Sequence, residues 1–247
     1  MMKSLLLFAF LLPRLCVAQI DFLASINSSV LVDAARPTGA FFSEGFEGTG
    51  YEKGSGAPNG WGEAGTVINE DYTATVLAGA QSLFLDTSGF FYCTNVWAAG
   101  AKDVVYGYIM FRLVVSAANS IRVELGRAAV GDDFYAEITN TGGLNKLRVI
   151  NGTVASGFGS TSILPSNVQT YGLWWEFRRD TDGGAASGVG RAWLSADPAI
   201  KGTLECETLV GDCVTQPTTV SLQASLNDQI IFDKLILSDV PIGSNPP

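Results

Sequence analysis

The sequence predicts an all-β fold in which two antiparallel sheets pack face to face as a sandwich. Short segments that alternate apolar and polar residues recur along the chain, and clusters of Gly, Asn, Asp or Pro separate most of them. Helical periodicity is almost absent. Strands that follow one another without crossover helices pair in antiparallel sheets, and two such sheets bury their apolar faces against each other.

Size and composition agree with a single domain of this kind. The chain has 247 residues, of which 47% are hydrophobic and 16% are charged, the balance of a globular protein and not of a disordered one. The expected strands are residues 67–76, 82–85, 104–115, 120–125, 134–139, 146–150, 171–179, 189–195, 219–224 and 230–237.

The two ends of the folded part carry matching patterns. Residues 41–52 (FFSEGFEGTGYE) and residues 230–243 (IIFDKLILSDVPIG) both alternate, and each sets an acidic residue beside an aromatic one. We therefore expect the first and last strands to lie side by side. The predicted domain spans residues 41–243, with residues 19–40 as a linker or extra strand and residues 244–247 as a short tail.

The N-terminus has the pattern of a secretory signal peptide. Lys3 precedes a short apolar run at residues 4–12, and the small-residue site Cys16-Val17-Ala18 follows, so cleavage would leave Gln19 first. The run is too short to span a bilayer. The sequence predicts a signal peptide at residues 1–18 and a secreted, extracellular or periplasmic product that is not inserted in a membrane.

Cysteine spacing is consistent with export. Cys206 and Cys213 bracket the short segment CETLVGDC, whose Gly211-Asp212 is suited to a turn, so a local disulfide is expected in an oxidising compartment. Cys93, within residues 90–94, is expected as a small buried apolar residue.

Two features exclude whole classes of function. The net charge of −9, with no basic cluster longer than Arg178-Arg179, disfavours nucleic acid as a partner. The absence of histidine removes Ser-His-Asp and Cys-His catalysis and histidine metal ligation.

The period of two along each strand sorts side chains onto opposite faces. It separates polar and aromatic residues from apolar ones in residues 105–113 and 173–179. The same sorting places on the polar side Arg122 and Glu124 of one strand, Tyr135 and Glu137 of the next, and Lys146 and Arg148 of a third. We expect one sheet face to gather aromatic, guanidinium and carboxylate groups suited to a sugar. Its candidate ligand-binding residues are Tyr108, Arg112, Glu124, Trp174, Glu176 and Arg178. The alternative is a solvated face with cross-strand ion pairs.

Three segments resemble the concanavalin A-like, or laminin G-like, jelly-roll superfamily. They are residues 44–51 (EGFEGTGY), 105–112 (VYGYIMFR) and 231–237 (IFDKLIL), and the resemblance covers about residues 41–243. It implies a jelly roll of two antiparallel sheets with a concave face and an inclination toward glycans. Because the superfamily holds lectins, carbohydrate-binding modules, glucanases, polysaccharide lyases and adhesion modules, it does not imply catalysis.

The resemblance also implies a structural Ca²⁺ near the meeting point of the first and last strands. Glu47 and Asp233 match that position and offer the hard oxygen ligands that Ca²⁺ needs. A competing segment, Asp180-Thr181-Asp182-Gly183, begins like an EF-hand loop, but its twelfth position is Arg191. We interpret that segment as a hairpin turn.

Three functions remain open from the sequence. The leading one is a secreted, non-catalytic carbohydrate-binding or adhesive domain with a glycan or polysaccharide as partner. The alternative is a polysaccharide-active enzyme, a hydrolase or lyase, with an unrecognised carboxylate or tyrosine site drawn from Glu124, Glu137 or Glu176. The Glu-x-Asp-x-x-Glu pattern of jelly-roll glucanases is not found, and the Gln-x-His strand of alginate lyases is impossible without histidine. The third is a structural surface or matrix protein.

Overall fold

The computed structural model describes residues 39–47, 61–64, 67–86, 90–93, 102–116, 120–126, 134–182, 186–225 and 227–246. All of them belong to one compact unit, Gly39–Pro246. The expected signal peptide at residues 1–18 lies outside the described residues, as does all but the end of the predicted linker. Regular structure in the described ranges consists of strands, and no helix there could cross a membrane.

The first sheet has eight strands, in the order β13-β12-β11-β6-β15-β4-β3, with β1 pairing to β15. Its strands are β1 (Ala40–Glu44), β3 (Val67–Tyr72), β4 (Ser82–Asp86), β6 (Val104–Val115), β11 (Tyr171–Arg178), β12 (Gly188–Ser195), β13 (Thr203–Gly211) and β15 (Gln229–Ser238). Neighbouring strands pair antiparallel throughout.

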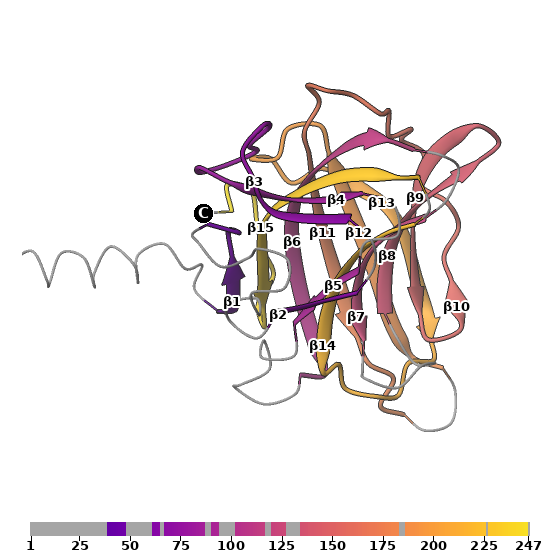
Figure 1. Cartoon of the computed structure of the whole chain (residues 1–247). Coiled ribbons are helices and arrows are strands. Elements are labelled where there is room, and N and C mark those ends of the chain that lie inside the picture. The colour runs from indigo at the N-terminus through magenta and orange to yellow at the C-terminus, as the bar shows by residue number, and fades with distance from the viewer. Residues whose placement is uncertain are drawn as a thin grey trace, which may run out of the picture. The chain divides into compact units, whose positions relative to one another are not determined.

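The second sheet has seven strands, in the order β10-β9-β8-β7-β14-β5-β2, again antiparallel. Its strands are β2 (Trp61–Ala64), β5 (Phe90–Cys93), β7 (Ser120–Gly126), β8 (Phe134–Thr141), β9 (Leu144–Asn151), β10 (Val154–Ala155) and β14 (Thr219–Ala224). Figure 1 shows the strands as two layers. The predicted all-β sandwich of two antiparallel sheets is confirmed.

The core lies between the sheets and follows the alternation in the sequence. In β6, Ile109, Phe111 and Leu113 are fully buried in the same apolar cluster as Leu125 of β7 and Phe134 of β8. A strand with an apolar residue at every second position has to cover that face, and the facing sheet provides the cover.

The first and last strands are neighbours, as expected (Figure 1). Phe42 of β1 lies opposite Leu237 of β15, and Glu44 lies opposite Leu235. Along one edge, β15 pairs first with β4, through residues 229–232, and then with β1, through residues 235–238. Asp233 and Lys234 lie where the partner strand changes, and Lys234 has a left-handed φ of 48°.

The structure contradicts the predicted disulfide between Cys206 and Cys213. Cys206 belongs to β13, which pairs with β12 along most of its length as far as the Gly188–Gly211 pair. From Cys206 to Gly211 an extended strand covers about 16 Å, whereas a disulfide needs Cα atoms within about 7 Å. Cys206 is a free thiol whose pKa burial raises to about 12, and the Cys213 thiol points to the Thr215 carbonyl oxygen at 3.6 Å. Cys93 is buried in the core, as expected.

Candidate functional site

The structure divides the predicted ligand-binding residues between the two sheets. Glu124 lies on β7 of the second sheet, while Tyr108, Arg112, Trp174, Glu176 and Arg178 lie on β6 and β11 of the first sheet. The expectation that they share one face is therefore wrong. Alternation assigns side chains to the two sides of a strand, but it does not state which strands belong to the same sheet.

The aromatic residues of the predicted face are covered by other parts of the chain. Tyr108 and Trp174 are each 1% exposed. The Tyr108 hydroxyl donates to the carbonyl oxygen of Pro198 at 2.8 Å, and Trp174 Nε1 donates to that of Gly243 at 3.1 Å. Ile242 packs in the same small apolar cluster. In this structure these rings are not available to a ligand.

The charged residues of the first sheet form cross-strand ion pairs. Glu176 accepts from Arg178 and from Arg191, each at 3.2 Å, and Arg191 also reaches Glu207 at 3.0 Å. Arg112 donates to the Asn167 carbonyl oxygen and to Thr170 Oγ1, both at 2.9 Å. This part of the predicted face matches the alternative interpretation, a surface of cross-strand ion pairs.

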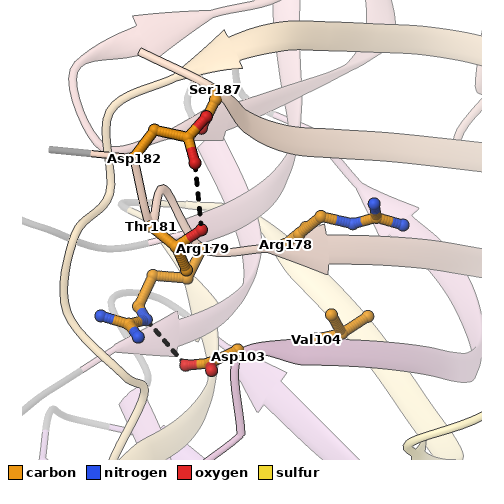
Figure 2. Close-up of a pocket in the computed structure, with 7 residues that line it drawn as sticks. All are labelled: Asp103, Val104, Arg178, Arg179, Thr181, Asp182 and Ser187. Carbon is orange, nitrogen blue, oxygen red and sulfur yellow. Dashed lines mark hydrogen bonds and ion pairs between the residues drawn. The ribbon is translucent and has the colours of Figure 1, made fainter. Parts of the chain in front are cut away.

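A pocket of about 330 Å³ lies at the end of β11, beside the turn into β12 (Figure 2). It is lined by Asp103, Val104, Arg178, Arg179, Thr181, Asp182 and Ser187. Arg179 Nε donates to Asp103 at 2.8 Å, and hydrogen bonds from Gln216 and Arg179 lower the pKa of Asp103. Arg179 and Asp103 therefore neutralise each other within the protein.

The turn beside this pocket is a hairpin connection between β11 and β12, as the sequence predicted. Asp180 Oδ1 accepts from the Asp182 backbone N–H at 3.1 Å and from the Ser187 hydroxyl at 2.8 Å. These hydrogen bonds lower the pKa of Asp180. The carboxylate therefore stabilises the turn.

The outer side of the second sheet carries a continuous polar and aromatic surface, which we call the ladder face. One cross-strand row places Ser221, Glu124 and Tyr135 opposite one another in adjacent strands, and the next row places Gln223, Arg122, Glu137 and Arg148 in the same way. Tyr92 extends the first row on β5 and Phe90 the second. Directly opposed residues have Cβ atoms about 5 Å apart, so each row is a set of touching side chains.

Glu137 is the centre of the ladder face. It is 1% exposed. One carboxylate oxygen accepts from Arg122 Nε at 3.0 Å, and the other lies 2.6 Å from Arg148. The Arg122 guanidinium also lies over the Tyr135 ring at 4.5 Å, and that of Arg148 over the Phe158 ring at 5.4 Å. Each guanidinium is therefore held by a carboxylate and by a ring.

The remaining ladder residues offer hydroxyl, amide and ring surfaces. The rings of Phe90 and Tyr92 are 5.3 Å apart, and Gln223 Nε2 donates to Glu124 Oε2. Burial raises the pKa of Tyr135, so its phenol stays protonated and is able to donate a hydrogen bond at neutral pH. Alternation had placed Arg122, Tyr135, Glu137 and Arg148 on outer sides of their strands, yet of the second sheet's residues only Glu124 was a predicted ligand contact.

Glu47 and Asp233 converge on one loop, residues 77–82. Asp233 Oδ2 accepts from the Ala78 backbone N–H at 2.9 Å and from the Ser82 hydroxyl at 2.8 Å, while Glu47 Oε1 accepts from the Ala80 N–H at 2.8 Å. Burial, with a smaller contribution from the Glu47 charge, raises the pKa of Asp233 to about 6.

The backbone around these two carboxylates is unusual. Phe46, which precedes Glu47, has φ 54°, Lys234, which follows Asp233, has φ 48°, and Gly79 in the loop has φ 65°. Non-glycine residues adopt this region at a cost and cluster at functional positions. Within the described residues, no group of three or more His, Cys, Asp or Glu side chains is arranged to hold a metal ion. Glu47 and Asp233 would therefore need hydroxyl, carbonyl or water oxygens to complete a coordination shell.

No known family profile matches the sequence, and no curated protein matches it significantly. Solved structures do resemble the fold. The cellulose-induced protein Cip1 aligns with a TM-score of 0.53 and 15% identity, over 82% of this chain and 99% of its own. The receptor-binding domain of botulinum neurotoxin mosaic serotype C/D aligns with a TM-score of 0.50 and 6% identity, over 83% of this chain and 48% of its own. The carbohydrate-binding module CBM66 from Bacillus subtilis aligns less closely, at 0.46 and 10% identity, over 73% of this chain and 96% of its own. At these identities the similarity to Cip1 and to the neurotoxin domain establishes a shared fold and no more.

Proposed function

We propose that the protein is a secreted, non-catalytic carbohydrate-binding domain of the concanavalin A-like jelly-roll type, and that the ladder face binds the glycan. The observation that carries this proposal is the Arg122–Glu137–Arg148 row beside the ring of Tyr135 on the outer side of the second sheet. The likeness of the fold to Cip1 is compatible with it.

The chemistry of the ladder face suits a sugar. Aromatic rings such as Tyr92 and Tyr135 stack on the C–H faces of pyranoses, while guanidinium, amide and phenol groups donate to hydroxyl and ring oxygens. Since Glu137 and the rings already hold both arginines, little side-chain entropy is lost when a ligand binds. A preorganised surface of this kind, whose rows run over five adjacent strands, favours binding of a polymer chain.

The enzyme alternative receives less support from the same geometry. Both oxygens of Glu137 are occupied by arginines, which opposes a role as general acid or base. Glu176 belongs to the first sheet, on the other side of the sandwich from Glu124. Of the predicted catalytic set, only Glu124 and Glu137 share a face, on the neighbouring strands β7 and β8. The two arginines on Glu137 oppose its use as one of the two carboxyl groups that flank a glycosidic bond.

A glycan array probed with the chain from Gln19 onward tests the proposal. Binding to at least one glycan is expected, and Tyr135→Ala should weaken it about tenfold because stacking and a hydroxyl contact are lost. Tyr106→Ala, on the first sheet, is the matched control and should leave affinity unchanged. No binding on the array, or equal losses in both variants, would contradict the proposal. Export is checked by N-terminal sequencing of secreted protein, which should begin at Gln19.

We also propose that Glu47 and Asp233 bind a structural Ca²⁺. The residues fit such an ion: the carboxylates of Glu47 and Asp233 converge on the loop that ends in the Ser82 hydroxyl. Burial, with a smaller contribution from the Glu47 charge, raises the pKa of Asp233. The ion would neutralise that charge and fix the loop against the last strand. Each of the three converging segments carries a residue with left-handed φ, and such residues cluster at functional sites, which supports a binding role for this loop.

A further inference from the structure

We infer that the ladder face selects anionic polysaccharides whose charge is carboxylate, that is, polymers of uronic acids. This inference rests on the proposed carbohydrate-binding function and names its ligand class. It starts from the charges that the described residues place on the outer side of the second sheet. Lys146 of β9, opposite Thr139 and two residues before Arg148, adds a third cation to Arg122 and Arg148, against the two carboxylates of Glu124 and Glu137, in a chain whose net charge is −9. A locally cationic surface on an acidic protein concentrates anionic ligands there.

The bonding of the two arginines shows where the excess positive charge lies. Glu137 is a single carboxylate shared by Arg122 and Arg148, so among the described residues the pair of guanidiniums keeps one positive charge that no carboxylate compensates. Each guanidinium has five N–H donors, and Arg122 uses Nε for Glu137. The described part of the chain gives Arg122 no second acceptor, apart from the face of the Tyr135 ring. Its terminal nitrogens are therefore available to a ligand.

The neighbouring groups favour acceptance of an anion over a neutral hydroxyl. Glu124, the other carboxylate of the face, accepts from Gln223, so part of its charge is satisfied within the protein. The phenol of Tyr135, which lies between Glu124 and Ile150 in its row, is a protonated donor. Donors from Arg122 and Tyr135 are thus carried by side chains that touch across adjacent strands.

The first sheet provides a useful contrast. There Glu176 is likewise shared by two arginines, Arg178 and Arg191, but Arg191 also binds Glu207, so carboxylates and guanidiniums balance. The ladder face lacks such a second carboxylate on its arginines among the described residues. The two-pronged guanidinium fork pairs bidentately with a planar carboxylate, the acid group that uronic acids carry, and this is why we infer uronic acids.

Matched polymer pairs test the inference. Polygalacturonate, alginate and hyaluronan are each compared with their carboxyl-reduced forms, in which every carboxylate becomes a neutral hydroxymethyl group on the same backbone. Affinity electrophoresis should show binding to at least one carboxylated polymer and at least a tenfold loss on reduction. Dextran sulfate should bind more weakly than that polymer.

Each other outcome overturns a defined part of the argument. Equal binding to the reduced forms, or binding of neutral glycans alone, rejects uronic acids while leaving the carbohydrate-binding function intact. Stronger binding to dextran sulfate shows a general anion-binding patch. The absence of binding to every carbohydrate tested rejects the ligand class and the proposed function together.

Arg122→Gln and Arg191→Gln form a matched pair of variants for the same assay. Each variant removes one positive charge and one of the two arginine partners of a buried glutamate. Arg122→Gln leaves Glu137 with Arg148, and Arg191→Gln leaves Glu176 with Arg178. Arg122→Gln should weaken binding of the carboxylated polymer about tenfold or more and change binding of its reduced form little. Arg191→Gln should change neither. Equal effects of the two variants would mean that overall charge, and not the ladder face, determines binding.

Discussion

The side-chain amide of Asn151 on β9 donates a hydrogen bond to the backbone carbonyl oxygen of Arg178 on β11, at 3.1 Å, and so joins the two sheets. The same Nδ2 donates to the Val189 carbonyl oxygen at 2.9 Å, and Oδ1 accepts from the Cys213 N–H at 3.2 Å. Asn151 has no exposed surface, and a Cβ at Gly211 would lie 2.3 Å from its Cγ. One amide therefore satisfies backbone groups from three separate segments.

Replacing Asn151 with Ala should destabilise the fold by about 3 kcal/mol, since three buried backbone groups lose a partner. Asn151→Asp should cost more, because a carboxylate would face two carbonyl oxygens. Urea denaturation measures both effects, with exposed Asn167→Ala as the control. A loss below about 1 kcal/mol in both Asn151 variants would mean that the amide does not hold the sheets together.

Asn151 also begins an Asn-Gly-Thr glycosylation sequence. Because every hydrogen-bonding group of its amide is in use inside the protein, a glycan at this position is incompatible with the fold. Folded protein secreted from a glycosylating host should therefore carry unmodified Asn151. Peptide mass spectrometry checks this, and recovery of a glycan on Asn151 in natively folded material would contradict the geometry.

The positions of the strands follow well from the sequence, and β6 begins and ends at the predicted residues, 104 and 115. The adjacency of β1 and β15 also follows, because the matching end patterns reflect two strands that cover one edge of the core. β13 was missed, because the cysteine spacing favoured a looped segment over a strand. Its own pattern, TLECETLVG, places Cys206 and Thr208 on the buried side.

The candidate site could be predicted less well from the sequence than the strands, for a physical reason. Alternation showed that Trp174 and Arg122 lie on the outer sides of their strands, but it carried no information about the sheet to which each strand belongs. It also could not show that residues 239–246, distant in sequence, cover Trp174. Outward-facing residues become a site only through tertiary pairing, which the register of β7, β8 and β9 provides for the ladder face.

The contact between Ile242 and the Trp174 cluster predicts that the C-terminal segment stabilises the fold. Ile242→Ala should cost about 2 kcal/mol, because a buried side chain is replaced by a cavity, whereas exposed Val240→Ala should cost less than about 0.5 kcal/mol. Thermal unfolding measures both. Glycan binding should stay unchanged in Ile242→Ala, since this cluster belongs to the first sheet. Weaker glycan binding in that variant would instead indicate that the covered rings take part.

Calcium should stabilise the protein if Glu47 and Asp233 hold the ion, because an ion that binds only the native state adds its binding free energy to stability. The melting temperature should rise with calcium concentration and fall on chelation. Asp233→Asn should abolish the response, and Asp239→Asn, an exposed carboxylate on the same segment, should retain it. An unchanged melting temperature in the parent protein over millimolar calcium would reject the site.

The raised pKa of Asp233 predicts an unusual pH dependence in the chelated protein. Burial, reinforced by Glu47, raises this pKa from 3.8 in the unfolded chain to about 6 in the native state, so between these values the native state binds more protons than the unfolded state. The contribution of Asp233 to the unfolding free energy is therefore most favourable below about pH 4. It declines as pH rises to about 6, by about 3 kcal/mol in all, and is constant above that.

Other carboxylates, such as Asp103 with its lowered pKa, act in the opposite direction, so the measured quantity is the difference in unfolding free energy between the parent protein and Asp233→Asn across pH 4–7 in EDTA. As pH rises, the parent protein should lose stability relative to Asp233→Asn. Saturating calcium should cancel or reverse this loss, because the ion binds the ionised carboxylate. A difference that does not vary with pH in EDTA would show that the carboxyl group is solvated as in the unfolded chain.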